Sequence, residues 1–117
     1  MEKSGYILLV EDEIIPAMQM TVELQRAGFR VLDFVCTGEE AVACALKEKP
    51  DLILMDINLA GKIDGIEAAT IIRKISSSVK IIMVTDYNEE LLKQKAFNTG
   101  VNDYLLKEEL TKLKNYL

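Results

Sequence analysis

Five polar side chains with complementary chemistry lie at the ends of short apolar runs in the sequence. Glu11 and Asp12 follow YILLV, Asp56 follows LILM, Thr85 follows KIIMV, and Lys107 follows YLL. Three carboxylates that converge on one crevice repel each other and therefore need a cation. Oxygen ligands without histidine or thiolate select a hard ion, and a few carboxylates plus water suit Mg2+ better than Ca2+. With a hydroxyl and an ammonium group beside the cation, the set predicts a phosphoryl-transfer site.

Taken one at a time, each of these residues has an ordinary structural explanation. An Asp or Thr after a strand is a good turn former or helix cap. A lysine in such a place is usually a solvated surface residue. The chemical interpretation therefore depends on elements that bring all five side chains to one edge of the fold.

Those elements alternate along the whole chain. Continuous apolar runs are typical of parallel strands covered on both faces, and apolar spacings of three and four between them predict helices. Pro16 suits the first turn of the first helix, and Thr37 with Glu40 forms a capping box for the second. Short connections predict a parallel sheet with helices on both faces. The predicted strands are 6–10, 29–35, 52–55, 80–84 and 104–106; the helices are one that ends before Gly28, 37–49, one containing Ile66, Ala69, Ile72 and Ile75, 89–99, and one containing Leu110, Leu113 and Leu117.

The parallel topology gives the five polar residues a common location. In an open parallel sheet, ligands bind beyond the carboxyl ends of the strands, where the strand order reverses. Residues from the first, third, fourth and fifth predicted strands would meet there, whereas the second strand offers only Cys36 and Thr37.

Composition narrows the class of protein. The chain has 117 residues, half of them hydrophobic, which suits one domain with a real core. Its net charge of -5 argues against direct binding of nucleic acid or an anionic membrane. Two cysteines without CxxC spacing, and no histidine, make a zinc site or a Cys/His nucleophile implausible. The N-terminus does not resemble a signal peptide and no apolar run reaches membrane-spanning length, so a cytoplasmic location is expected.

The chain resembles the receiver domain of two-component response regulators. The resemblance covers essentially residues 1–117, from YILLVEDE through LILMDINL and IIMVTD to GVNDYLLK, with the order and spacing of the five motifs preserved. It implies a flavodoxin-like, doubly wound, five-stranded parallel sheet of strand order 2-1-3-4-5, with five helices on two faces. A single receiver domain is expected, either as a stand-alone regulator or as part of a longer multidomain protein.

The resemblance also implies a role for each site residue. Asp56 would be the phosphoacceptor, and Mg2+ or Mn2+ would be held by Glu11, Asp12, Asp56 and the backbone carbonyl of Asn58. Lys107 and Thr85 would contact the phosphoryl group, and Tyr104 would follow Thr85 as an aromatic switch residue.

The implied function is a signalling switch rather than a conventional enzyme. Asp56 would accept a phosphoryl group from a phosphohistidine on a histidine kinase or a histidine phosphotransfer protein. The domain would catalyse its own phosphotransfer and slow hydrolysis of the aspartyl phosphate. It would then change conformation and alter partner binding, with a homodimer among the partners that the family permits.

Three departures from the family pattern fall near the site. Asp86 follows Thr85 where a small residue is usual, and would either repel a phosphoryl donor or cap the next helix. Glu108 replaces a proline that usually follows a cis peptide bond, so a trans bond is expected after Lys107. The loop LAGKIDG after Asp56 is one residue longer than usual and should change shape without touching the ligands. Asn58, Asp86 and Tyr87 are candidate modulators: Asn58 and Tyr87 of the lifetime of the phosphorylated state, and Asp86 of the competence to be phosphorylated.

The first helix has two apolar sides. Its core stripe is predicted at Ala17, Met20, Leu24 and Ala27, which leaves a second set largely on the other side at about 100 degrees per residue. An apolar outer face beside the acidic pocket could dock a kinase helical bundle or a second receiver, although scattered surface residues or a rotated helix would give the same pattern. The residues of this second set are Ile14, Ile15, Met18 and Val22.

Three other functions compete with the switch. A degenerate receiver that acts only as an interaction module is suggested by Asp86 and Glu108. A metal-dependent phosphohydrolase with an aspartyl phosphate intermediate would need a cap insertion, which the sequence lacks. A flavin binder is disfavoured because the first loop is acidic where a phosphate needs donors.

Overall fold

Five parallel strands form the centre of the computed structural model, which describes residues 6–86 and 88–116. The strands are β1 (Tyr6–Val10), β2 (Arg30–Val31), β3 (Leu52–Met55), β4 (Lys80–Thr85) and β5 (Asp103–Leu106). They pair in the order β2-β1-β3-β4-β5, all parallel. The predicted strand order is therefore confirmed, and the strand order reverses between β1 and β3.

The edge strand β2 is shorter than the predicted strand 29–35. Leu32 N–H donates to Ile7 O (2.9 Å), but the next bond to β1 comes from Val35 N–H to Leu9 O (3.0 Å). Between these two bonds the chain advances by three residues, from 32 to 35, while β1 advances by two, from 7 to 9. One extra residue therefore interrupts the ladder, as in a β-bulge. Pairing with β1 resumes only as an isolated bridge between Val10 and Val35.

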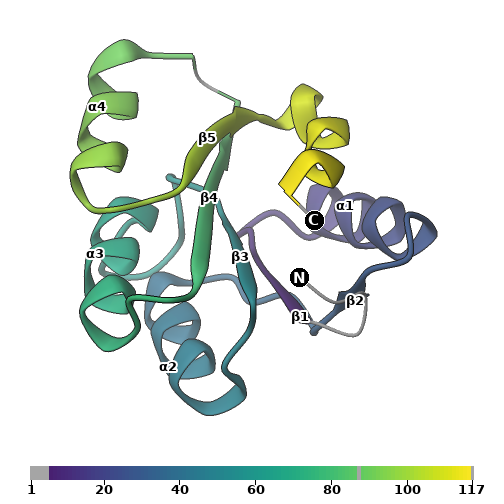
Figure 1. Cartoon of the computed structure of the whole chain (residues 1–117), viewed down its shortest axis with the longest axis horizontal. Coiled ribbons are helices and arrows are strands. Elements are labelled where there is room, and N and C mark those ends of the chain that lie inside the picture. Colours follow the sequence, from purple (N-terminus) through teal and green to yellow (C-terminus); the bar gives the residue numbers. More distant parts are fainter. Residues whose placement is uncertain (1–5, 87, 117) are drawn as a thin grey trace.

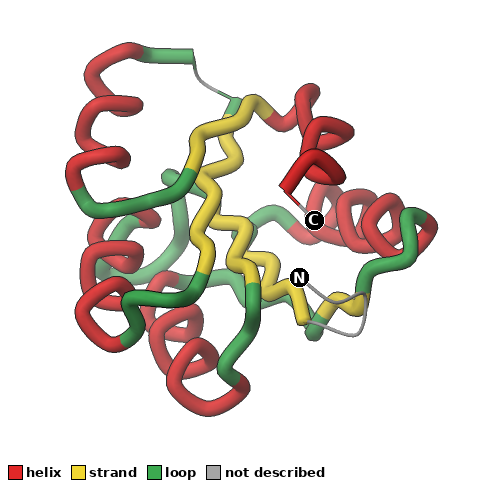
Figure 2. The backbone as a smooth tube through the Cα atoms, in the orientation of Figure 1, coloured by secondary structure: helices red, strands yellow, loops and turns green. Residues whose placement is uncertain are grey.

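Helices cover both faces of the sheet, as the apolar strands require. The helices α2 (Gly38–Glu48), α3 (Gly65–Ile75) and α4 (Glu90–Asn98) lie on one face, while α1 (Ile14–Arg26) and the 3₁₀ helix η1 (Lys107–Tyr116) lie on the other (Figure 1). Figure 2 shows the strands as one central layer between these two helical layers. Successive strand residues face opposite layers, so runs such as ILLV are buried throughout.

Two hydrophobic clusters fill the space between the sheet and its helical layers. The cluster under α1 and η1 contains Ile7, Leu9, Ala17, Met20, Leu24, Leu52, Leu54, Ile82, Val84, Leu105, Leu110 and Leu113. The cluster under α2, α3 and α4 contains Leu8, Val10, Ala41, Ile53, Met55, Ile57, Ala68, Ala69, Ile72, Val79, Ile81, Met83, Ala96, Val101 and Tyr104.

The last predicted α-helix is instead a 3₁₀ helix. It begins at Lys107, directly after β5, so the described chain has four α-helices rather than five. Leu110 and Leu113 are buried three residues apart, which is one turn of a 3₁₀ helix with its three residues per turn. The predicted third apolar position, Leu117, lies outside the described residues.

The predicted core position Ala27, at the end of α1, is wrong, and Ile75 at the end of α3 is exposed in the same way. Ala27 is exposed because α1 ends at Arg26 and Ala27 is its C-cap residue. Ile75, in the last turn of α3, is 43% exposed although Ala69 and Ile72 are buried. In both cases the helix ends before the stripe reaches the core again. The predicted N-cap of α2 is confirmed, because the Glu40 N–H donates to Thr37 Oγ1 (3.1 Å).

Candidate functional site

The carboxyl ends of β1, β3, β4 and β5 bring the predicted site residues together. Asp56 N–H donates to Val10 O (3.0 Å), so β1 and β3 end side by side. Thr85 pairs in register with Leu106, which places Lys107 at the end of the neighbouring strand. Glu11, Asp56 and Thr85 are all buried, although each is polar. Such residues need partners or a ligand in the crevice.

Three carboxylates form the centre of the site. One oxygen from each of Glu11, Asp12 and Asp56 lies within 4.8 Å of the others. The set is built from oxygen alone, with no nitrogen or sulfur ligand, as a hard divalent cation prefers. The donor set therefore fits the ion predicted from the sequence.

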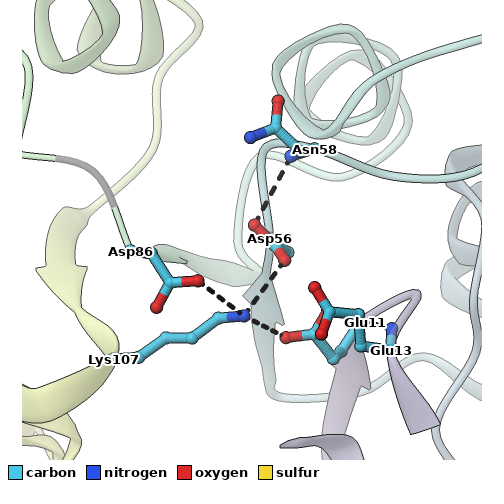
Figure 3. Close-up of polar contacts among 6 residues, drawn as sticks. All are labelled: Glu11, Glu13, Asp56, Asn58, Asp86 and Lys107. Carbon is cyan, nitrogen blue, oxygen red and sulfur yellow. Dashed lines mark hydrogen bonds and ion pairs between the residues drawn. The ribbon is translucent and has the colours of Figure 1, made fainter.

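Lys107, the first residue of η1 directly after β5, partly balances this negative charge. Its Nζ donates to Glu11 Oε1 and lies 3.4 Å from Asp56 Oδ2 and 3.6 Å from Asp86 Oδ2 (Figure 3). Glu11 also accepts a hydrogen bond from Glu13 N–H at 3.2 Å. Glu13 itself is the N-cap of α1 and makes no side-chain cap.

The electrostatics show that one ammonium group does not offset three carboxylates. Burial raises the pKa of Asp56 to about 7, and Glu11 adds to this effect while Lys107 opposes it. Burial and the Glu11 carboxylate also raise the pKa of Asp12. Burial acts in the same direction on Glu11, but the Lys107 ammonium and a hydrogen bond with Asp56 hold the pKa of Glu11 below its ordinary value. A bound cation would favour the ionised form of all three.

The charge of Lys107 is strengthened by the same neighbours. Its burial lowers the pKa of the ammonium, but the surrounding carboxylates, Glu11 first, outweigh burial and hold the pKa above its ordinary value. Lys107 is therefore a permanent cation next to the Asp56 carboxylate.

Two backbone groups after β3 complete the surroundings of Asp56. Asn58 N–H points at Asp56 Oδ1 at 3.4 Å (Figure 3). Gly65, at the start of α3, packs against the backbone of Asp56 so closely that a Cβ there would lie 1.9 Å from Asp56 O. Sequence reasoning missed this constraint, and the only signal for it was the glycine after the loop.

A comparison with known protein families identifies the family to which this fold belongs. The family model for the response regulator receiver domain matches residues 7–117. The chain belongs to the response regulator receiver domain family. It is thus a receiver domain of a two-component response regulator, as the sequence motifs indicated.

Curated and solved relatives agree with this assignment. The response regulator protein VraR of Staphylococcus aureus is 35% identical over 102 residues, covering 86% of this chain and 48% of VraR. The chain thus spans about half the length of the curated relatives it matches. Among solved structures, the BeF3-activated N-terminal receiver domain of Klebsiella pneumoniae RstA has a TM-score of 0.85, with 27% identity and coverage of 95% of this chain and 97% of that one. A DNA-binding response regulator of the LuxR family from Staphylococcus aureus has a TM-score of 0.87, with 26% identity and coverage of 96% and 97%.

The departures from the receiver pattern have clear structural outcomes. The bond between Lys107 and Glu108 is trans, as predicted, and the described residues contain no cis peptide bond. Asp86 is 63% exposed at its side chain and pairs with Lys107. It does not cap α4, whose N-cap is Glu89. Tyr87 lies outside the described residues.

Thr85 and Tyr104 lie on adjacent strands below the site. Thr85 is fully buried at the end of β4, and Tyr104 is 6% exposed in β5, opposite Met83. Burial and the nearby Glu89 raise the pKa of the Tyr104 hydroxyl. Their predicted coupling as a switch remains a prediction.

The outer face of α1 is exposed, as its second apolar stripe predicted. The exposed fractions are 60% for Ile14, 70% for Ile15, 56% for Met18 and 43% for Val22. Met18 and Val22 also line a groove of about 210 Å³ between α1 and the segment after β2. A rotated helix is therefore excluded as the explanation of this stripe.

In the part of the chain that the structure describes, no helix is both long enough and apolar enough to span a bilayer.

Proposed function

We propose that Asp56 is the phosphoacceptor of a Mg2+-dependent switch. The observation that carries this proposal is the buried Asp56 carboxylate, which faces Glu11 and Asp12 on one side and the Lys107 ammonium on the other. The Lys107 ammonium lies 3.4 Å from Asp56 Oδ2, within reach of a phosphoryl group bonded to that carboxylate.

Glu11, Asp12, Asp56 and the backbone carbonyl of Asn58 would hold the ion. Mg2+ (or Mn2+), when bound, supplies charge neutralisation for the phosphoryl oxygens. The Asp56 carboxylate has to be ionised to act as a nucleophile, and Lys107 favours that form.

In the transfer step, one Asp56 oxygen bonds to phosphorus while the phosphorus–nitrogen bond of a donor phosphohistidine breaks. The electron pair of that bond stays on the imidazole nitrogen, and the donor histidine leaves as a neutral imidazole because its other ring nitrogen already carries a proton. Lys107 then exchanges its Asp56 contact for a phosphoryl oxygen, a charge-assisted pair that holds the group in place. Positioning and charge supply most of the rate, as in other phosphoryl transfers.

The same chain would translate the modification into a conformational change. Phosphorylation adds up to about two negative charges and strong acceptors. The Thr85 hydroxyl at the end of β4 and Lys107, directly after β5, are the groups that can bind them, and Tyr104 would move with Thr85. Hydrolysis of the acyl phosphate by water would reset the switch.

The donor would be a histidine kinase or a histidine phosphotransfer protein. We infer that its helical bundle docks on the exposed face of α1, because this face is apolar and α1 begins three residues after Glu11. We keep two further partner assignments as proposals: a homodimer, and no direct contact of this segment with nucleic acid.

Asp86 is the residue of this site with the clearest modulating position. Its carboxylate competes with an incoming phosphoryl group for Lys107 and adds negative charge at the mouth of the crevice. This observation also supports the second candidate function, a degenerate receiver that acts as an interaction module without phosphorylation.

Intact-mass measurement after incubation with Mg2+ and a phosphodonor distinguishes the two functions. The donors are a small acyl phosphate, phosphoramidate and a set of histidine kinases, and the control variant is Asp56→Asn. We expect one phosphoryl adduct that depends on Asp56 and Mg2+ and is labile to base. If no donor gives this adduct, the interaction module becomes the better assignment.

A further inference from the structure

The N-terminus of α2 holds the loop of residues 58–64 that follows the phosphoacceptor. Thr37 forms a parallel bridge with Ala60. The Glu39 carboxylate accepts hydrogen bonds from Lys62 N–H, at 3.2 Å to Oε1 and 3.3 Å to Oε2, and from Ile63 N–H at 3.2 Å. These contacts join segments that are far apart in the sequence and give the longer loop a defined anchor.

Two glycines make this close approach between α2 and the loop achievable. Gly61 has φ +98, a left-handed conformation that side chains rarely adopt, and a Cβ there would lie 2.7 Å from Glu39 Oε2. Gly38 is buried, and a Cβ there would lie 2.6 Å from Ile63 Cγ1. The loop is therefore shaped to present its amides to this carboxylate.

The hydrogen bonds are of the charge-assisted kind. The pKa of Glu39 is lowered, chiefly because Lys62 N–H donates to its carboxylate; Ile63 N–H acts in the same direction, and desolvation opposes both. An ionised carboxylate that accepts backbone N–H groups makes stronger bonds than a neutral acceptor.

Both ends of the loop are fixed by other groups. Asn58 N–H points at Asp56 at one end, and Asp64 forms a reciprocal capping box with Glu67 at the other. Between them, residues 59–63 are tied to α2 by Glu39 and the Ala60 bridge. Without Glu39, the middle of the loop would sample more conformations, and Asn58 at its start would be less well placed.

We propose that Glu39 is a positioning residue of the metal site: it holds loop 58–64 in the conformation that presents Asn58 beside Asp56. Glu39 is not among the carboxylates that converge on Asp56, and its carboxylate accepts hydrogen bonds from loop amides, so it would act through the loop. The inference rests on the proposed function because it names the support of the same Mg2+ site.

Hydrogen exchange and Mg2+ titration followed by amide NMR test this role in the wild type, Glu39→Ala and Glu39→Gln. In metal-free Glu39→Ala we expect faster exchange at the amides of Lys62, Ile63 and Asn58. We expect the Kd for Mg2+ to rise roughly tenfold, at the lower end of the effect of outer-shell partners on metal affinity. Glu39→Gln keeps one acceptor oxygen without the charge, and should give an intermediate Kd.

Glu40→Ala is the matched control, because Glu40 lies in the same turn of α2 but its carboxylate contacts Thr37 rather than the loop. Its Kd should equal that of the wild type, and the amides of β1 and β3 should stay protected in every variant. A Kd of Glu39→Ala within about twofold of the wild type would overturn the inference. Faster exchange at the amides of Lys62 and Ile63 with unchanged exchange at the amide of Asn58 would also overturn it. Should Glu39→Ala fail to fold, the comparison of Glu39→Gln with Glu40→Ala decides the question. A wild type that binds no Mg2+ would instead remove the proposed function.

Discussion

Replacing Asp56 by Asn should stabilise the metal-free domain at neutral and higher pH. The pKa of Asp56 is raised from 3.8 to about 7, so the ionised carboxylate is less favourable in the folded state than in the unfolded chain. Below about pH 4 the Asp56 carboxyl is protonated in both the folded and the unfolded state, so it does not lower the unfolding free energy. Between about pH 4 and 7 the folded state binds the proton more tightly, and stability is lost as the pH rises. Above about pH 7 the full cost is present.

The magnitude follows from the size of the pKa change. At about 1.36 kcal/mol per pKa unit, the change corresponds to at most ~4 kcal/mol of unfolding free energy at about pH 8. The pKa of about 7 already includes the attraction between Asp56 and Lys107, which lie 3.4 Å apart. The Asn amide is itself a buried polar group that loses water on folding, so we expect a net gain of about 2 kcal/mol for this variant.

Urea unfolding in EDTA between about pH 4.5 and 8 measures this gain. The difference between Asp56→Asn and the wild type should grow with pH across this range and be smallest at its acidic end. Asp33→Asn, the same change at an exposed position, serves as the control for a general effect of charge. Mg2+ at about ten times its Kd should stabilise the wild type by about 1.4 kcal/mol. The difference in unfolding free energy between Asp56→Asn and the wild type should then become smaller. A variant no more stable than the wild type at the alkaline end of the range would refute the reasoning, as would a gain independent of pH.

Three further predictions concern the site and its partner face. Asp86→Ala should raise the initial rate of phosphorylation by a small acyl phosphate roughly fivefold, because one charge about 4 Å away contributes ~1 kcal/mol in water; an unchanged rate in the intact-mass assay would remove the modulating role. Lys107→Met should lower the unfolding free energy of the metal-free domain by about 3 kcal/mol, because buried carboxylates lose their cation. Urea titrations with and without Mg2+ should show that the ion restores part of this loss. An equal loss of unfolding free energy in the presence and absence of Mg2+ would contradict a site that Lys107 shares with the ion. Met18→Glu with Val22→Glu should slow transfer from the kinase about tenfold, an effect of ~1.4 kcal/mol, and leave small-molecule phosphorylation unchanged. Leu91→Glu, at another exposed apolar position, on α4, should not slow transfer; if it does so to the same extent, the α1 face is not the docking site.

The candidate site could be predicted from the sequence because of how parallel sheets are built. Strands buried on both faces give continuous apolar runs, so the polar residue after each run marks a carboxyl end. Glu11, Asp56 and Lys107 were found in this way, and the strand order then places them in one crevice. The exposed stripe of α1 was readable for the same reason, since a regular period fixes which residues share a face.

The partners of individual side chains could not be predicted in the same way. Asp86 could equally well have capped the next helix, and only the tertiary structure directs its carboxylate to Lys107. Glu39 belongs to no motif in the sequence, yet its carboxylate binds amides of a loop 23 and 24 residues away. Such contacts depend on distances between elements and on rotamers, which carry no periodic signal.

The sequence by itself determined the class of fold, the carboxyl ends of β1, β3, β4 and β5, and the types of side chain that gather there, because the order of apolar and polar residues sets burial and strand–helix alternation. The tertiary structure decided the bulge after β2, the 3₁₀ form of η1 and the pairing of Lys107 with three carboxylates. It also decided the high pKa of Asp56, since a pKa depends on burial and on charges that only folding brings within a few ångströms.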